Sequence, residues 1–175
     1  MKKTSKQILD IGIRYLLLVA VAIPNLWFFY FIFTSLTIYP ANFILGLIFD
    51  SSLSGNVITI SNCFPIELIG ACIGASAYYL LFILNFATPG IDTKKRIRIL
   101  AFAFLAFLVL NLLRIILLSI MFVSGSSLLD VTHKVFWYLL STLFVVGIWF
   151  AEVKLFKIKA IPFYSDLNWL YKKIK

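Results

Sequence analysis

Four long apolar stretches constrain this chain more than any other feature of its sequence. They cover about residues 15–37, 65–87, 97–123 and 131–153. A helix needs roughly 20 apolar residues to cross about 30 Å of hydrocarbon, and each stretch is long enough. Only 13% of the residues are charged, against roughly 25% in soluble domains. The sequence therefore predicts an all-α fold, a polytopic membrane helix bundle of four transmembrane helices, with residues 1–175 forming a single domain.

The positive charges fall on one side of this expected bundle. The loops at residues 38–64 and 124–130 contain no Lys or Arg, whereas short basic runs flank the other ends of the apolar stretches. By the positive-inside rule, both chain ends face the cytoplasm and the uncharged loops face outward. The net charge of +9 is explained by this topology. No basic face interleaved with aromatic residues is present, so we expect no nucleic-acid partner.

The remaining segments have weaker signals. Residues 42–49 are apolar but too short to span, which indicates an interfacial segment in the first outer loop. Val57–Ile60 follows a turn signal and is typical of a short extended piece. We expect Pro24 to kink the first span. Residues 154–175 form a cytoplasmic tail with an amphipathic, lysine-flanked helix at the inner membrane surface. The first apolar stretch is too long for a removable signal peptide.

Ionisable residues at membrane depth are costly, so they are candidates for function. Glu67 lies near the outer end of the second stretch, and Cys72 lies five residues deeper. Arg114 lies about 15 Å below the outer end of the third stretch, at 1.5 Å per helical residue. His133 opens the fourth stretch from the outside. Because neighbouring spans run in opposite directions, Cys72 and Arg114 are expected at similar depths, with His133 slightly above them.

A thiol, a guanidinium and an imidazole from three helices could therefore converge on one outward-facing cavity. A cysteine attacks as its thiolate, and a nearby cation favours that form. Arg114 could stabilise the thiolate or the oxyanion of a tetrahedral intermediate. His133 could act first as a base and then as the acid that protonates the leaving amine. These roles are those of nucleophilic catalysis.

Each of these residues also has a structural interpretation. The small residues around Cys72 are typical of a close helix–helix contact. His133 could cap a helix, and Arg114 could form a structural ion pair with Glu67. Cys63 and Cys72 could form a disulfide on the outer side. Their spacing is not that of a metal site, and the sequence indicates neither a metal nor an organic cofactor.

The flanks of the three candidate residues resemble the exosortase and archaeosortase family. The matching segments are Ala71-Cys72-Ile73-Gly74-Ala75-Ser76, Asn111-Leu112-Leu113-Arg114-Ile115 and Asp130-Val131-Thr132-His133. The family consists of polytopic membrane enzymes with Cys, Arg and His in this order and at about this spacing. The resemblance covers about residues 58–150. It departs at Ile73, where the family often has a small or hydroxylic residue. With four spans, the chain resembles a short, archaeal-type member.

The resemblance implies a membrane-embedded cysteine protease or transpeptidase in the cell membrane, with its active site on the extracellular side. Its substrates would be secreted proteins that carry a C-terminal motif, a hydrophobic helix and a basic cluster. Cys72 would form a thioester with the upstream part, with Arg114 and His133 as charge stabiliser and acid–base, before transfer to a lipid or lipid-linked acceptor. The residues expected to contact the substrate are Glu67, Gly70, Gly74 and Asn111, the two glycines offering a docking face for its helix.

A second interpretation comes from a different class of protein. The chain could be a non-enzymatic ligand-binding subunit or scaffold of a transporter. Arg114 would then hold an anionic ligand, and Cys72 would be a packing residue replaceable by Ser or Ala. A conducting channel is disfavoured, because one buried charge on four spans offers no ring of polar side chains.

Overall fold

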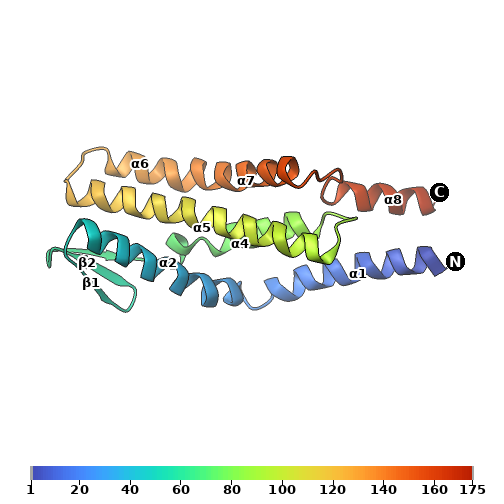
Figure 1. Cartoon of the computed structure of the whole chain (residues 1–175), viewed down its shortest axis with the longest axis horizontal. Helices are drawn as coiled ribbons and strands as arrows, with labels where there is room; N and C mark the ends of the chain where they lie inside the picture. The colour runs from blue at the N-terminus through green and yellow to red at the C-terminus, as the bar shows by residue number, and fades with distance from the viewer. Residues whose placement is uncertain (1, 175) are drawn as a thin grey trace.

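The chain folds into an elongated bundle whose helices run roughly along one axis (Figure 1). The computed structural model describes residues 2–174, with side chains for residues 7–139 and 141–173. In chain order the elements are α1 (Lys2–Ala22), α2 (Trp27–Ile48), β1 (Ser51–Ser54), β2 (Val57–Ile60), β3 (Phe64–Glu67), α3 (Gly70–Ile73), α4 (Ala75–Phe86), α5 (Thr93–Val123), α6 (Leu129–Val135), the π-helical segment η1 (Phe136–Leu140), α7 (Ser141–Leu155) and α8 (Tyr164–Ile174). The strands lie at one end of the bundle, here called the sheet end, and both chain termini lie at the other, the termini end.

The helical content and the membrane-compatible helices agree with the sequence. Within the described residues, α2 with 22 residues and α5 with 31 are long and apolar enough to cross a membrane. The run α6–η1–α7 is bent by 46° and makes a third candidate if it counts as one span. It extends over Leu129–Leu155, close to the expected 131–153. By contrast, α4 has 12 residues, or about 18 Å, which is shorter than the hydrocarbon layer.

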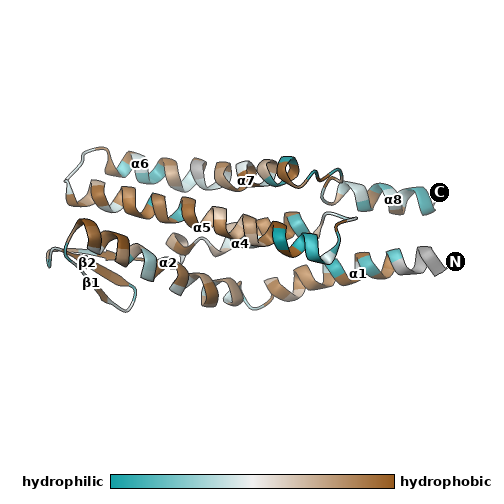
Figure 2. Cartoon of the chain, viewed as in Figure 1, coloured by the Kyte–Doolittle hydropathy of each residue, from teal (hydrophilic) through white to brown (hydrophobic). Residues whose placement is uncertain are grey.

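Helix α5 is the centre of the bundle, because α2, α4 and α7 all pack against it. Its buried stripe includes Ile99, Ala103, Phe107, Asn111, Ile115 and Ser119. Its opposite face exposes Leu105, Val109, Leu113 and Leu117. Figure 2 shows that hydrophobic residues also predominate in the neighbouring helices α2 and α4. A helix in water would carry polar residues on its exposed face, so the apolar stripe favours contact with lipid.

The first apolar stretch does not form one kinked helix over residues 15–37. Helix α1 ends at Ala22 and α2 begins at Trp27, with left-handed backbone at Asn25 (φ 49°) and Leu26 (φ 58°). Pro24 therefore ends a helix, because it removes a backbone donor and restricts the residue before it. Figure 1 shows α1 and α2 following one another along the bundle.

Residues 42–49 do not form a separate segment of a loop, because α2 continues through them to Ile48. Their place in the membrane interface stays a prediction. Pro40 lies inside this helix. A proline there costs a hydrogen bond, but Ala41 and Leu45 on the following turns are fully buried. Their packing against the core offsets the loss, so the helix continues.

The all-α expectation misses a three-stranded antiparallel sheet with the order β1-β2-β3. The extended piece expected at Val57–Ile60 is confirmed as β2. Ile58 and Ile60 on this strand are fully buried, and α2 packs against β1 and β2. The third strand takes up the start of the expected second span, so helical structure begins only at Gly70.

A single glycine divides the rest of the second stretch. Gly74 has φ 76° and lies between α3 and α4. A Cβ atom there would lie 3.1 Å from the ring of Phe107 on α5. Glycine is thus required both for the left-handed backbone and for the close approach of α5. The expected helix 65–87 is therefore a strand, a one-turn helix and a 12-residue helix.

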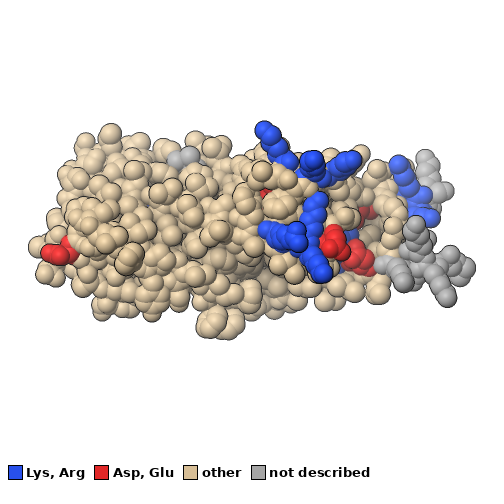
Figure 3. Space-filling view, viewed as in Figure 1, with Lys and Arg blue, Asp and Glu red and all other residues tan. Residues whose placement is uncertain are grey.

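Positively charged side chains are concentrated toward the termini end. On the face drawn in Figure 3, Lys and Arg side chains gather toward this end and none is visible at the sheet end. The helix expected in the tail is confirmed as α8, which exposes Tyr164, Leu167 and Tyr171 and carries Lys172 and Lys173 in its last turn. An ion pair of 2.9 Å between Arg14 and Asp166 fixes α8 to α1.

Candidate active site

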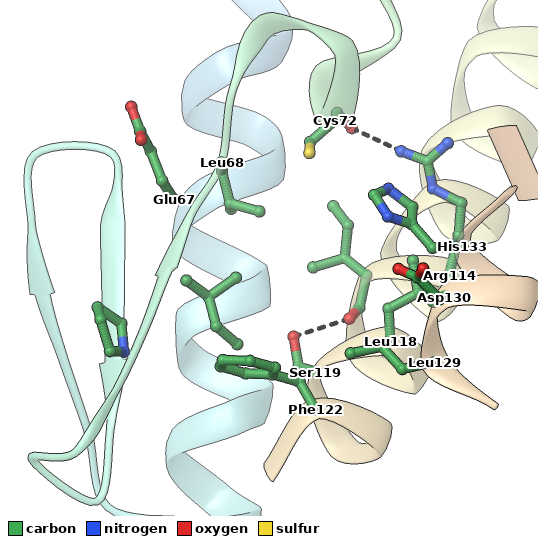
Figure 4. Close-up of a pocket in the computed structure, with 13 residues that line it drawn as sticks. Glu67, Leu68, Cys72, Arg114, Leu118, Ser119, Phe122, Leu129, Asp130 and His133 are labelled. Carbon is green, nitrogen blue, oxygen red and sulfur yellow. Dashed lines mark hydrogen bonds between the residues drawn. The ribbon is translucent and has the colours of Figure 1, made fainter. Parts of the chain in front are cut away.

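A cavity of about 260 Å³ lies at the sheet end, and all three expected catalytic residues line it. Cys72 comes from α3, Arg114 from α5 and His133 from α6. Its walls also include Pro65, Ile66, Glu67, Leu68, Ile115, Leu118, Ser119, Phe122, Leu129 and Asp130. Figure 4 shows the Cys72 thiol directed into this space, with the Arg114 guanidinium and the His133 imidazole across from it. Three residues distant in sequence are thus brought together.

The thiol is carried by a short, irregular part of the backbone. Helix α3 has only four residues, between strand β3 and the left-handed Gly74. The Cys72 N–H donates to the Ile69 carbonyl at 2.8 Å. Cys72 is half-buried and its sulfur is a free thiol. Broken helices at membrane depth occur where the backbone lines a cavity, and this segment does so.

Arg114, which is half-buried, places a cation beside the Cys72 backbone. Its Nη2 donates to the Cys72 carbonyl at 3.4 Å, and its Nη1 donates to Ser141 Oγ, also at 3.4 Å. Its buried Nε has no hydrogen-bond partner among the described residues. In the same part of the chain no carboxylate forms an ion pair with Arg114, so the alternative pairing with Glu67 is not formed. The positive charge is left unneutralised next to the cavity.

Asn111 lies three residues before Arg114, one turn earlier on α5, and also contacts the backbone at Cys72. Its Nδ2 donates to the Cys72 carbonyl at 2.8 Å and reaches the Ile73 carbonyl at 3.4 Å. The side chain is buried, with 2% exposed, and it does not line the cavity. Asn111 was expected to contact substrate. Its observed contacts hold the backbone of α3, and its contact with substrate stays a prediction.

His133 forms part of the exposed wall. Its ring faces the cavity opposite Cys72 in Figure 4 and packs edge-on against Trp137, with 6.1 Å between ring centroids. Helix α6 begins at Leu129, so His133 lies in its second turn and is not a cap. Asp130 nearby is paired with Lys134 at 3.6 Å, and both side chains are exposed. Among the described residues, no hydrogen bond fixes the imidazole.

Of the other residues expected to contact the substrate, one lines the cavity and two do not. Glu67 lines the cavity through strand β3, but its carboxylate is exposed and points away in Figure 4. A Cβ at Gly70 would lie 3.1 Å from the ring of Tyr30 on α2, and Gly74 faces Phe107. Both glycines therefore approach helices of this same chain, and neither lines the cavity. Their role in docking a substrate helix stays a prediction.

The two cysteines do not form the disulfide considered from the sequence. Cys63 is exposed, Cys72 is half-buried, and both are free. Over the described residues, no group of three His, Cys, Asp or Glu side chains is arranged to hold a metal ion.

Sequence reasoning missed Ser141, which orients Arg114. Ser141 Oγ donates to the Phe136 carbonyl at 2.7 Å while it accepts from Arg114. The available signal was its position as a hydroxyl residue within an apolar stretch, two turns beyond His133. Such residues often bond to their own helix, and the structure is needed to see the second partner.

It also missed a buried polar group at the termini end, here called the inner cluster: Asn85 on α4, Arg96 on α5 and Glu152 on α7. Asn85 Nδ2 lies 3.2 Å from both carboxylate oxygens of Glu152. Arg96 donates to the backbone carbonyls of Asn85 and Thr88. Asn85 and Glu152 are fully buried and Arg96 nearly so. The cluster links three helices and lies far from the cavity.

Comparison of the chain with family models, with curated proteins and with solved structures finds no match. The function is therefore inferred from the chemistry of the cavity, together with the resemblance of the three motifs that supply its polar residues.

Proposed function

We propose that the chain is a membrane-embedded cysteine protease or transpeptidase of the exosortase and archaeosortase type. It cleaves C-terminal sorting signals of secreted proteins and transfers the upstream part to a lipid-linked acceptor. One observation carries the proposal: Cys72, Arg114 and His133 come from three separate elements and line one cavity. A thiol, an unpaired cation and an imidazole around one space are the groups that covalent catalysis by cysteine requires.

The proposed topology has four crossings, with both termini in the cytoplasm and the cavity on the extracellular side. The positive charges at the termini end support it, as do the loops at residues 38–64 and 124–130, which have no Lys or Arg. The second crossing consists of the segment from β3 through α4. Helix α4 alone is too short to cross. The irregular segment before it therefore completes the crossing, and it lines a cavity that opens to the outside.

In the proposed reaction, the Cys72 thiolate attacks the carbonyl carbon of the scissile peptide bond. The C–S bond forms, the C–N bond breaks, and the leaving amine takes a proton from the imidazolium of His133. The upstream chain is then held as a thioester. A nucleophile of the acceptor, or water, attacks this thioester, gives its proton to His133 and releases the thiolate.

Arg114 supports this chemistry through its charge. The guanidinium lies against the Cys72 backbone with no carboxylate partner among the described residues. Ile115, Leu118 and Phe122 line the same cavity, and apolar walls strengthen the interaction between the cation and a thiolate or oxyanion. An apolar cavity beside lipid-facing helices also suits a substrate whose signal contains a hydrophobic helix.

The direct test replaces Cys72 by Ala in the native cells and follows the C-termini of secreted proteins by mass spectrometry. We expect cleavage of C-terminal signals to stop while the variant is still inserted in the membrane. Cys63→Ser is the matched control, because it changes the other free thiol and should leave processing intact. Continued processing in Cys72→Ala would overturn the proposal.

A chemical test needs no substrate. Iodoacetamide is applied to membranes that contain the Cys63→Ser protein, and alkylation of Cys72 at pH 7 is compared with that of free cysteine. We expect a faster reaction than the reference, slowed about tenfold or more in Arg114→Gln and several-fold in His133→Ala, because a thiolate without its cation is less populated. An inert thiol that is indifferent to both changes would favour the transporter-subunit interpretation.

A further inference from the structure

Strand β3 has one paired edge and one free edge, and the free edge faces the cavity. The order β1-β2-β3 leaves β3 paired only with β2. Pro65, Ile66, Glu67 and Leu68 line the cavity, whereas no residue of β1 or β2 does. In Figure 4, β3 is the strand that runs beside the cavity, with the other two strands behind it.

The hydrogen-bond pattern identifies the backbone groups on this free edge. The Leu68 N–H donates to the Asn56 carbonyl at 2.9 Å, and residues of an antiparallel pair bond to their neighbour alternately. Phe64 and Ile66 therefore direct their backbone groups toward β2, while Pro65 and Glu67 direct theirs away. Proline has no N–H and is tolerated in this position on an edge strand.

Three backbone groups are left for another partner: the carbonyl of Pro65, and the N–H and carbonyl of Glu67. Within the described chain, no turn, loop or neighbouring element forms a backbone hydrogen bond with them. An exposed edge of this kind is a template for an added strand. Here it lies in the wall of the same cavity as Cys72.

We propose that an extended segment of the polypeptide substrate binds along this edge as a fourth strand and presents its peptide bond to Cys72. The inference rests on the proposed function and assigns its mode of substrate recognition. Strand addition derives its affinity from main-chain hydrogen bonds, with side-chain contacts adding specificity. The chain passes from Glu67 to Cys72 in five residues, so a segment that leaves the edge beyond Glu67 is directed toward the thiol.

The charge beside the edge indicates the chemistry of the bound segment. Glu67 is exposed and has no ion pair among the described residues. A residue directly opposite Glu67 on an added strand has its side chain on the same face of the sheet. Lys or Arg at that position would pair with Glu67. A second copy of this chain that paired through the same strand would bring a second Glu67 to this edge, so like charges disfavour it.

The experiment uses acetyl-Ala-Ala-Ala chloromethyl ketone with the full-length Cys63→Ser protein in membranes. Its methylene carbon forms a thioether with Cys72 and chloride leaves. The comparison probes are the same peptide with its amide nitrogens methylated, and iodoacetamide, which has no strand to add. We expect methylation to slow alkylation about tenfold, as the loss of one or two hydrogen bonds would. Equal rates for the two peptides would overturn strand addition.

Two substitutions at Glu67 separate the contribution of its backbone N–H to probe binding from that of its carboxylate. Glu67→Pro removes the edge N–H, whereas Glu67→Ala keeps it and removes the carboxylate. We expect the trialanine probe to react about fivefold more slowly with Glu67→Pro than with Glu67→Ala, because only the proline removes the edge N–H. A probe with one Ala replaced by Lys, tried at each of three positions, should react about twofold faster at one of them, and Glu67→Ala should abolish that gain. Equal losses in both variants would contradict the proposal.

Iodoacetamide makes the two proposals separable. A Cys72 that is inert to it in the unsubstituted protein counts against the proposed function, whereas a reactive Cys72 with no preference for the unmethylated peptide counts against strand addition alone. If Glu67→Pro changes the iodoacetamide rate, the proline has disturbed the fold. The pair of peptides on the Glu67-containing protein then decides the question.

Discussion

The two ends of the bundle differ in whether their polar groups inside the protein have partners. At the termini end the charged groups are paired: Glu152 accepts from Asn85, and Arg14 and Asp166 form an ion pair in which each side chain is 6% exposed. Asn85 Oδ1 is the exception there, a buried atom with no hydrogen-bond partner among the described residues. At the sheet end, Arg114 has no carboxylate partner among the described residues, and Cys72 and His133 face a cavity without a side-chain hydrogen bond there.

This difference separates groups that hold the fold from groups that are available to a ligand. A buried polar group is costly unless it is hydrogen-bonded, so paired groups between helices stabilise their arrangement. The inner cluster links α4, α5 and α7, and the Arg14–Asp166 pair links α1 and α8. The groups around the cavity have fewer or weaker partners and contribute less to the stability of the free protein. Their presence is best explained by a ligand or a reacting group.

The largest expected effect is on stability, at the termini end. Asn85→Leu removes the amide that donates to both oxygens of the buried Glu152 carboxyl. An unsatisfied buried group of this kind should lower the free energy of unfolding by about 3 kcal/mol. Denaturant unfolding in micelles would measure it. The double variant Asn85→Leu, Glu152→Leu should recover part of the loss, since it removes both partners.

The matched change at the sheet end sharpens the contrast. Arg114→Leu also replaces a polar side chain, but a half-buried one that has two long hydrogen bonds of 3.4 Å and, among the described residues, no partner for its buried Nε. We expect it to cost about 1 kcal/mol in the same unfolding measurement, with ~0.5 kcal/mol for each of the two weak bonds lost. If Arg114→Leu destabilised the protein as much as Asn85→Leu, Arg114 would be a structural residue and the comparison would fail.

The sequence predicted that Cys72, Arg114 and His133 would line one cavity, because their depths along neighbouring spans can be counted from the sequence. Cys72, Arg114 and His133 lie on segments that run in alternate directions, and counting residues from the outer ends placed them together. The expected span 97–123 agrees with α5 for the same reason, since a long apolar run between a basic cluster and a Ser–Gly turn has one simple solution.

What the sequence did not predict depends on contacts between distant residues. Pro24 ends a helix whereas Pro40 does not, and the difference lies in the burial of Ala41 and Leu45, which only the tertiary structure decides. Pro65 fits the first turn of a helix as well as an edge strand. Pairing with β2 selects the strand.

The inner cluster could not be predicted from the sequence for a related reason. Asn85 and Glu152 are 67 residues apart, and each alone resembles an interfacial residue near the end of an apolar stretch. Only the packing of α4 against α7 brings the amide to the carboxyl. A sequence can therefore mark a polar residue within a span, but it does not say whether that residue has found a partner.

The next effect in size concerns the backbone that carries the thiol. Gly74→Ala places a side chain at φ 76° and 3.1 Å from the Phe107 ring. We expect a loss of about 2 kcal/mol in stability, from the left-handed backbone and the crowding together, and an altered alkylation rate at Cys72 because α3 must shift. Gly147→Ala is the control: its Cβ would meet nothing within 4 Å, and alanine favours the helix. Equal effects at both positions would mean that Gly74 is not a required break.

The smallest effect tests whether Arg114 is held in place for the thiol. Ser141→Ala removes the hydroxyl that accepts from Arg114 Nη1 at 3.4 Å but leaves the contacts of Arg114 and Asn111 with the Cys72 carbonyl. Because one weak bond is lost, we expect iodoacetamide to react with Cys72 about twofold more slowly, with stability nearly unchanged. Ser119→Ala is the control, since Ser119 lines the cavity, which Ser141 does not, and its hydroxyl donates to Ile115 of its own helix at 2.8 Å and not to Arg114. A slower reaction in Ser141→Ala alone would place Ser141 among the residues that position the cation. A change of the same size in both variants would mean that the loss of any hydroxyl near the cavity, and not the orientation of Arg114, lowers the reactivity of the thiol.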